Sequence, residues 1–373
     1  MITTRIFLRL GAGVLALAAA GTANADALSD FYKGKRLTMF VGSGVGGGYD
    51  TYSRTLARHY NKYVPGKPRM LVKNMPGAGG LRVTNYMYNK AKRDGSVIAS
   101  TFNTMMLEPL IGNRGAKFDV FKFNWLGSIG KLQAVCVTWH TSPIKTLADA
   151  KGKVLTVSAT GATGNSAKMP RIFNWAVGTK FKVIQGYSTS GSRLALERGE
   201  VDGICGLGYS TLLASNPDWI AKKKLNFLAQ IGLYKHPKLP QVPMILQDIK
   251  DERTRKIVEL ILIQQEPGRP YIAPPGVPAE RVKVLTSAFK SAIEDPAFLA
   301  DAKRLKLEIT YLGPKTIRAL MTRAYANPRD IVEGAAKLVG RPAKGVVTKC
   351  SKYTKSAKWC RKKKKKKKKK KAS

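Results

Sequence analysis

The sequence holds few of the residues on which metal sites and hydrolytic active sites depend. Its 373 residues include four cysteines and three histidines, and His59, His140 and His236 lie far apart. A structural zinc site takes about four ligands at short spacings, so none is expected. The patterns G-x-x-x-x-G-K-[ST], G-x-S-x-G and H-E-x-x-H do not occur, which argues against a Walker A site, a serine hydrolase and a zinc protease. We therefore expect a binding protein, not an enzyme, with neither a metal nor a cofactor; an exported enzyme is the third alternative, because the three histidines leave a catalytic triad open.

Long apolar runs are missing beyond the first 25 residues. A membrane-spanning helix needs roughly 20 apolar residues, and the apolar run Leu10–Ala20 has only 11. It follows the short basic segment Met1–Arg9 and precedes the small-residue site Ala23–Ala25. This layout is typical of a secretory signal peptide; a short buried helix at the start of the fold is the alternative. We expect cleavage after Ala25, which leaves a soluble protein exported out of the cytoplasm.

Acidic residues are scarce, with 23 Asp and Glu against 66 Lys and Arg and a net charge of +43. Seventeen of the basic residues lie in residues 341–373, which contain no acid and include the unbroken run of ten lysines Lys362–Lys371. A block of like charge repels itself and is expected to be disordered. The rest of the chain is still basic, which favours anionic ligands through its long-range field.

The lysine run supports a second hypothesis, in which an exported protein binds a polyanion of the cell envelope through its tail. Nucleic acid is not expected as a partner, because its recognition adds stacking aromatic side chains to a basic surface and the run contains none. We expect Cys350 and Cys360, which flank a short loop beside the tail, to form a disulfide in an oxidising compartment. Cys136 and Cys205 lie in apolar, strand-like segments, where we expect them to be buried and reduced.

Strand-like and helix-like segments alternate along the chain in two blocks, residues 35–105 and 150–231. Such alternation predicts βαβ units with parallel sheets, so the expected fold class is α/β with two lobes. A cleft between them would bind a ligand outside the carboxyl ends of the strands. The expected division is a signal peptide at 1–25, the first part of lobe 1 at 26–131, lobe 2 at 132–224, the rest of lobe 1 with the C-terminal helices at 225–340, and a Lys-rich tail at 341–373.

Four glycine-rich turns lie between a predicted strand and a predicted helix: Gly46–Asp50, Met75–Leu81, Thr160–Ser166 and Tyr187–Ser192. The first belongs to a G-x-G-x-x-G pattern, but residues 51–93 contain no acid that could hold the ribose of a dinucleotide. Glycines let the backbone present successive N–H groups, and a helix N-terminus adds about half a positive charge. The turns together predict an anion site; the alternative is that each glycine only permits a tight connection.

Five blocks occur in order: GGGYDTYSR (46–54), VKNMPGAGGLRVTNYMYNKAKRDG (72–95), TGATGNSAKMP (160–170), GYSTSGSRLALERGEVDG (186–203) and YIAPPGVPAERVKVL (271–285). In this order they resemble the tripartite tricarboxylate transporter receptors, the Bug family of periplasmic solute-binding proteins, from about Phe31 to Gly340. The resemblance implies a type II periplasmic-binding-protein fold, the Venus flytrap, in a monomer. Its lobes would close on a small carboxylate, which is a di- or tricarboxylate or another organic acid, and deliver it to the membrane permease subunits.

In that family the loops between strands and helices hold the ligand carboxylate largely through backbone groups and small polar side chains. The resemblance carries this role to Gly47, Gly48, Tyr49, Asp50, Gly77, Ala78, Gly79, Thr160, Gly164, Asn165, Ser166, Tyr187, Ser188 and Ser192. Since the four turns contain no arginine, we expect a site that needs no buried arginine, with Asp50 capping the helix after its turn. Lys168 and Met169 replace a His-Leu pair that is frequent in the family, and residues 350–371 lie outside its pattern.

Overall fold

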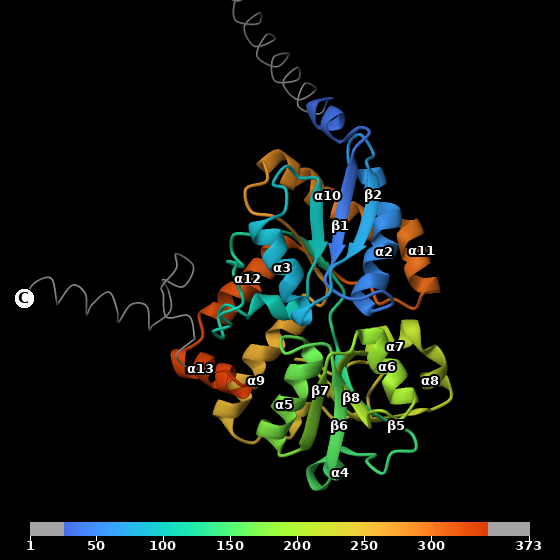
Figure 1. The fold of residues 1–373 in the computed structure, drawn as a ribbon, viewed down its shortest axis with the longest axis vertical. Helices are drawn as coiled ribbons and strands as arrows, with labels where there is room; N and C mark the ends of the chain where they lie inside the picture. Colours follow the sequence, from blue (N-terminus) through green and yellow to red (C-terminus); the bar gives the residue numbers. More distant parts are fainter. Residues whose placement is uncertain (1–25, 342–373) are drawn as a thin grey trace, which may run out of the picture.

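The computed structural model describes residues 26–341, which form two α/β lobes stacked end to end (Figure 1). The first lobe contains a six-stranded sheet of order β11-β4-β10-β3-β1-β2, and the second a five-stranded sheet of order β7-β6-β8-β5-β9. The two-lobed α/β architecture expected from the sequence is confirmed. The expected signal peptide, the Cys350–Cys360 disulfide and the lysine run lie outside the described residues.

The first sheet combines three parallel strands with three antiparallel ones. In β1 the side chains of Leu37, Met39 and Val41 are buried while their neighbours are not, which is the alternation of a strand with one face in the core. The strands are β1 (Arg36–Val41), β2 (Arg69–Asn74), β3 (Val97–Ser100), β4 (Asn124–Ile129), β10 (Pro270–Ala273) and β11 (Tyr311–Leu312). The helices of this lobe are α2 (Gly48–Tyr60), α3 (Leu81–Asn89), α10 (Ala279–Glu294), α11 (Pro296–Arg304) and α12 (Pro314–Tyr325), with the short 3-10 helices η1 (Asn61–Tyr63), η2 (Ala78–Gly80) and η3 (Asn103–Met106).

The second sheet is mixed, because β6 runs parallel to β7 and β8 while β5 runs antiparallel to β8 and β9. Its strands are β5 (Ala134–Trp139), β6 (Val154–Ala159), β7 (Lys180–Gln185), β8 (Gly203–Gly208) and β9 (Leu225–Ile231). The helices are α4 (Leu147–Gly152), α5 (Asn165–Val177), α6 (Thr189–Glu197), α7 (Tyr209–Ser215) and α8 (Pro217–Ala221). No helix within residues 26–341 has the length and apolarity needed to cross a membrane.

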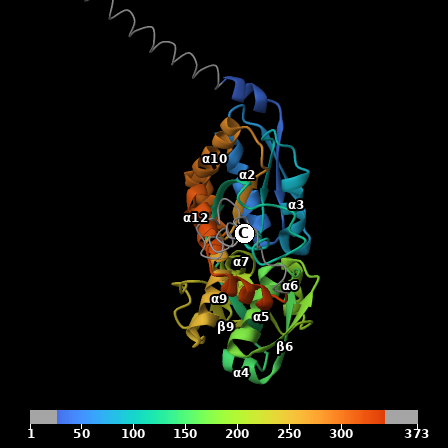
Figure 2. The ribbon, with the colours of Figure 1, turned by 90° about the vertical axis from the view of Figure 1, so that its left-hand side faces the viewer.

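The chain enters the second lobe between β4 and β5 and leaves it after β9. The expected division ended lobe 2 at residue 224, whereas β9 pairs with β5 along its whole length, so residues 225–231 belong to the second sheet. The return passes through η4 (Ile245–Gln247), α9 (Glu252–Leu262) and η5 (Ile263–Gln265) before β10. The last helix, α13 (Arg329–Leu338), packs on α9 and also contacts α5. In Figure 1 and Figure 2 this red helix lies at the level where the lobes meet.

The two cysteines of the second sheet correct one expectation. Cys136 of β5 and Cys205 of β8 are opposite each other in the antiparallel pair, and their sulfur atoms are joined in a disulfide. Both are buried, as expected, but the prediction that they stay reduced is wrong. Directly opposed residues on adjacent strands bring their Cβ atoms into the range that a disulfide needs. The two cysteines are 69 residues apart in sequence, so the residues around each of them gave no sign of the disulfide.

Candidate ligand-binding site

A cavity of about 60 Å³ lies between the two lobes. The first lobe contributes Gly48, Tyr49, Phe102 and Arg269, and Leu132 comes from the connection between β4 and β5. The second lobe contributes Thr160, Asn165, Ser166, Thr189, Ser192, Ile204, Gly206, Leu207, Gly208 and Thr211. The wall is therefore apolar over much of its area, with hydroxyl, amide and guanidinium groups at separate points.

Three helices begin at this cavity, because the first residues of α2, α5 and α6 line it. The N-caps of α2 and α5 are Gly47 and Gly164, and neither helix start is capped by a side chain. In α6 the Ser188 hydroxyl accepts a hydrogen bond from the N–H of Gly191. A helix start leaves up to four backbone N–H groups without a helical partner, and its dipole favours an anion there. The cavity consequently has the field and the donors of an anion site.

Arg269 is the one charged residue that lines the cavity within the described part of the chain. It is only 1% exposed, and no carboxylate of residues 26–341 lies within ion-pair distance of its guanidinium. The Nη2 atom donates to Ser210 Oγ at 2.9 Å, and the guanidinium carbon lies 3.8 Å from the centre of the Tyr52 ring. Neither Nε nor Nη1 has a hydrogen-bond partner in the part of the protein that the structure describes. A buried cation without a counter-charge is costly, so this geometry calls for an anionic partner.

Tyr49 connects the cavity to a buried amide network. Its hydroxyl lies 2.9 Å from the carbonyl oxygen of Gly268 and accepts the backbone N–H of Asn103 at 3.1 Å. The Asn103 carboxamide oxygen in turn accepts from Asn165 Nδ2 at 3.2 Å, which links the lobes. Burial raises the pKa of Tyr49 to about 12, so the phenol stays protonated and remains a donor near neutral pH. Stacking on Phe102, with ring centres 4.5 Å apart, fixes its orientation.

Six of the fourteen residues proposed from the sequence line the cavity: Gly48, Tyr49, Thr160, Asn165, Ser166 and Ser192. The other eight, Gly47, Asp50, Gly77, Ala78, Gly79, Gly164, Tyr187 and Ser188, lie in the same turns but do not line it. The strands and helices thus bring the four turns together at the junction of the lobes. Three of the turns line the enclosed space in part, and no residue of the turn Met75–Leu81 lines it.

The turn Gly77–Gly79 meets the second lobe rather than the cavity. The Thr163 hydroxyl donates to the carbonyl oxygen of Ala78 and lies 3.3 Å from that of Gly79. A Cβ on Gly79 would come within 2.4 Å of the Gly164 nitrogen, and the φ of Gly79 is +62°. Glycine is required here both by the left-handed conformation and by the contact between two backbones. These loops therefore seal one side of the closed cleft.

The first turn makes a second contact across the cleft. Ser190 Oγ donates to the carbonyl oxygen of Val45 at 3.2 Å, and Arg193 Nη2 donates to that of Gly46 at 3.2 Å. Burial lowers the pKa of the Arg193 guanidinium. Gly48 faces Thr211, whose Oγ1 would lie 2.3 Å from an added Cβ. The turns thus touch one another on both sides of the cavity, which is the geometry of closed lobes.

Asp50 faces away from the cavity and organises its own turn. Its carboxylate accepts the backbone N–H of Gly46 at 3.0 Å, Arg54 Nε at 2.9 Å and Asn74 Nδ2 at 2.8 Å. The expectation that Asp50 caps α2 is wrong, because this helix has no side-chain cap and the N–H that Asp50 accepts belongs to Gly46, ahead of the N-cap Gly47. The Asp50 carboxylate is neutralised by Arg54 and is kept from repelling an anion in the cavity.

Sequence reasoning missed Arg269 and expected a site without a buried arginine, which the structure corrects. The signal available was a single arginine between Gly268 and Pro270, directly before a strand. Only the position of β10 in the middle of the first sheet carries this side chain to the cavity. Phe102, Leu132 and the residues of β8 were missed for the same reason, since strand order across the sheets was not predicted.

A family model described as the tripartite tricarboxylate transporter family receptor matches residues 54–334. Among solved structures, the periplasmic binding protein BugD is similar, with a TM-score of 0.66 and 20% identity over 82% of this chain and 97% of that chain. MatC from Rhodopseudomonas palustris with bound malate gives a TM-score of 0.62 and 18% identity, covering 82% of this chain and 99% of that one. An R. palustris protein with adipate gives a TM-score of 0.64 and 15% identity, covering 82% of this chain and 97% of that chain. A search of curated protein sequences gives no match. At these identities the solved structures support the fold.

Proposed function

The chain belongs to the tripartite tricarboxylate transporter receptor family, whose members are periplasmic solute-binding receptors, and we propose that it captures a small organic carboxylate between its lobes and delivers it to the transporter permease. Receptors of this family bind solutes and do not transform them, and we propose the same of this chain. The ligand would sit in the cavity where α2, α5 and α6 begin.

The observation that carries the proposal is Arg269, a buried guanidinium that lines the cavity and has no carboxylate partner among the described residues. A guanidinium presents its N–H groups in a planar fork that matches the two oxygens of a carboxylate. A bound carboxylate would therefore supply the missing counter-charge. The uncapped starts of α2 and α5 would share the remaining charge through backbone N–H groups.

The size and lining of the cavity indicate which kind of carboxylate it would hold. The similar structures contain malate and adipate, and both are small dicarboxylates. In this chain the cavity is small and holds one arginine, with apolar contacts from Phe102, Leu132 and Leu207. We propose a short-chain organic acid, with one carboxylate on Arg269 and the remainder of the molecule among the hydroxyl and apolar groups of the second lobe.

A thermal-shift panel of short mono-, di- and tricarboxylates tests the proposal. A ligand present at 100 times its Kd stabilises the folded state by about 2.7 kcal/mol, and a chain of this size shifts by roughly 2 °C or less per kcal/mol. A rise of a few degrees with at least one acid is expected, with matched neutral amides as controls. If every acid behaves like its amide, carboxylate binding is wrong. Uptake of the labelled acid into vesicles that hold the permease, with and without this protein, tests delivery.

A further inference from the structure

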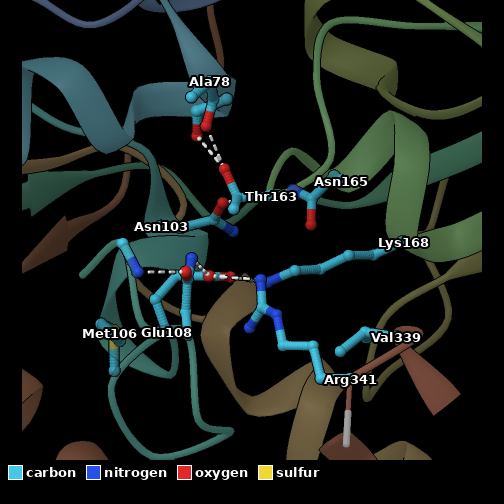
Figure 3. Close-up of polar contacts among 12 residues, drawn as sticks. Ala78, Asn103, Met106, Glu108, Thr163, Asn165, Lys168, Val339 and Arg341 are labelled. Atoms are coloured by element: carbon cyan, nitrogen blue, oxygen red, sulfur yellow. Dashed lines mark hydrogen bonds and ion pairs between the residues drawn. The ribbon is translucent and has the colours of Figure 1, made fainter. Parts of the chain in front are cut away.

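A buried ionic cluster joins the two lobes beside the cavity (Figure 3). Glu108 lies in the first lobe just after η3 and is fully buried. Its Oε1 is 2.5 Å from the Nζ of Lys168, which comes from α5 of the second lobe. Its Oε2 is 2.6 Å from Nη2 of Arg341, which follows α13. The Asn113 amide also donates to this oxygen. One carboxylate of the first lobe is thus held by Lys168 of the second lobe and by Arg341, which follows the helix that packs on α9 and contacts α5.

The burial of this cluster distinguishes it from the ion pairs on the surface. The Lys168 side chain is 1% exposed and that of Arg341 is 14% exposed. Burial lowers the pKa of Lys168, and the nearby Glu108 carboxylate opposes that shift. Taking ions out of water costs free energy that only good partners offset. Glu108, Lys168 and Arg341 can therefore be buried between closed lobes only when the carboxylate lies against both cations.

The cluster is also close to the ligand-binding end of α5. Lys168 follows Asn165 and Ser166, which line the cavity, within the first turn of the same helix. Three residues span only about 4.5 Å along a helix axis. Asn165 is further linked to the first lobe through Asn103 Oδ1 at 3.2 Å. Holding Lys168 on Glu108 consequently fixes where the start of α5 stands relative to the first lobe.

We propose that Glu108, Lys168 and Arg341 are positioning residues that form a latch between the lobes, holding them closed and setting the start of α5 at the cavity before any ligand arrives. The effect on ligand capture rests on the proposed function, whereas the effect on closure does not. When the lobes separate, water solvates all three groups. When they close without Glu108, two cations are left without their carboxylate, and closure is disfavoured. Loss of Lys168 or Arg341 removes one of the two ionic contacts that hold Glu108.

The test uses the ligand-free, full-length protein and two measurements of closure. Small-angle X-ray scattering reports the separation of the lobes, and hydrogen exchange reports the amides of residues 163–168. The variants are Glu108→Gln and Lys168→Met, each of which removes one partner. The matched control is Lys222→Met, which breaks the exposed pair of Lys222 with Asp218 on the second lobe, where both side chains are more than two-thirds exposed.

We expect both latch variants to show a larger radius of gyration and at least tenfold faster exchange at the start of α5. The control and the wild-type protein should give the same compact scattering curve. The double variant Glu108→Gln/Lys168→Met leaves only the partly exposed Arg341 unpaired, where Glu108→Gln leaves two cations, so it should open less than Glu108→Gln. A purely structural role would lower the melting temperature without changing the lobe separation of the folded protein.

Arg341→Gln provides a second route if a core variant fails to fold, because Arg341 lies at the end of the described chain and is partly exposed. It should open the lobes in the same direction. Latch variants that remain folded with wild-type scattering and exchange would overturn the proposal. So would a wild-type protein whose lobes are already apart without ligand. Either result leaves carboxylate binding to be judged by the thermal-shift panel alone.

Discussion

Arg269→Met removes the one cationic group of the cavity and keeps a side chain of similar length. If the guanidinium holds the ligand carboxylate, its loss takes away a buried, hydrogen-bonded ion pair. Truncating one partner of such a pair costs about 2–5 kcal/mol of binding free energy. At about 1.4 kcal/mol per tenfold change in Kd, affinity should fall by roughly 30-fold to a few thousand-fold. Arg269→Lys keeps the charge but loses the planar fork, so its affinity should lie in between.

The stability of the ligand-free protein should change much less than its affinity. Arg269→Met removes the bond to Ser210 and the contact with the Tyr52 ring, which are worth about 1 kcal/mol each. It also removes a buried charge of which two nitrogen atoms lack a partner within residues 26–341, and the stability gained in this way opposes the loss. We expect the free energy of unfolding without ligand to change by less than about 2 kcal/mol.

Titration calorimetry, with the acid that shifts melting most, measures the affinity, and urea denaturation without ligand measures the stability. Arg198→Met is the matched control, because its side chain is 67% exposed at the end of α6. Wild-type affinity in folded Arg269→Met would refute the anchoring role. A loss of more than about 3 kcal/mol of unfolding free energy without ligand would instead show a structural arginine, since a buried cation with good partners costs that much to disrupt.

Three further changes test other parts of the structure. Gly79→Ala places a Cβ 2.4 Å from a backbone nitrogen of the second lobe, so calorimetry should show at least tenfold weaker binding while both lobes remain folded. The control Gly152→Ala should bind normally, because nothing lies within 4 Å of its added Cβ. Alkylation of the denatured, unreduced protein should leave Cys136 and Cys205 unmodified, and labelling of both before reduction would contradict the disulfide. Replacing both by alanine should lower the unfolding free energy by up to about 4 kcal/mol in the loop-entropy model. Deleting Lys362–Lys371 should abolish low-salt adsorption to anionic vesicles, since each lysine contributes about 1 kcal/mol there, and should leave ligand affinity within twofold; a loss of affinity would place the tail in the binding site.

The parts of this fold that depend on local sequence were predictable. The buried alternation of β1 and the glycine turn before α2 are written in neighbouring residues, and the ordered blocks identified the family, which the match over residues 54–334 confirms. β9 was assigned to the wrong lobe because its apolar pattern suits either sheet, and only its pairing with β5 decides between them.

The site was harder to predict than the fold, because its geometry depends on contacts distant in sequence. Gly48 and Asn165 were found from their turns, and both line the cavity. Gly79 was found in the same way but contacts the other lobe, because closure brings one turn onto the next. Arg269 became visible only once strand order was known. Arg269 is buried with no carboxylate of the described residues beside it. This environment arises only when the lobes are assembled, and no short segment of sequence reveals it.

The position of β10 between β3 and β4 has a consequence for the order in which the molecule folds. The strands on either side of β10 precede the entire second lobe in the chain, whereas β10 follows it. Until β10 emerges, the nascent first sheet exposes unpaired backbone edges on β3 and β4, which are sites of intermolecular strand pairing. The second lobe has all its strands contiguous in sequence and can form first. We therefore expect residues 36–129 to be the stretch that most needs protection by chaperones, until synthesis of the second lobe and β10 is complete.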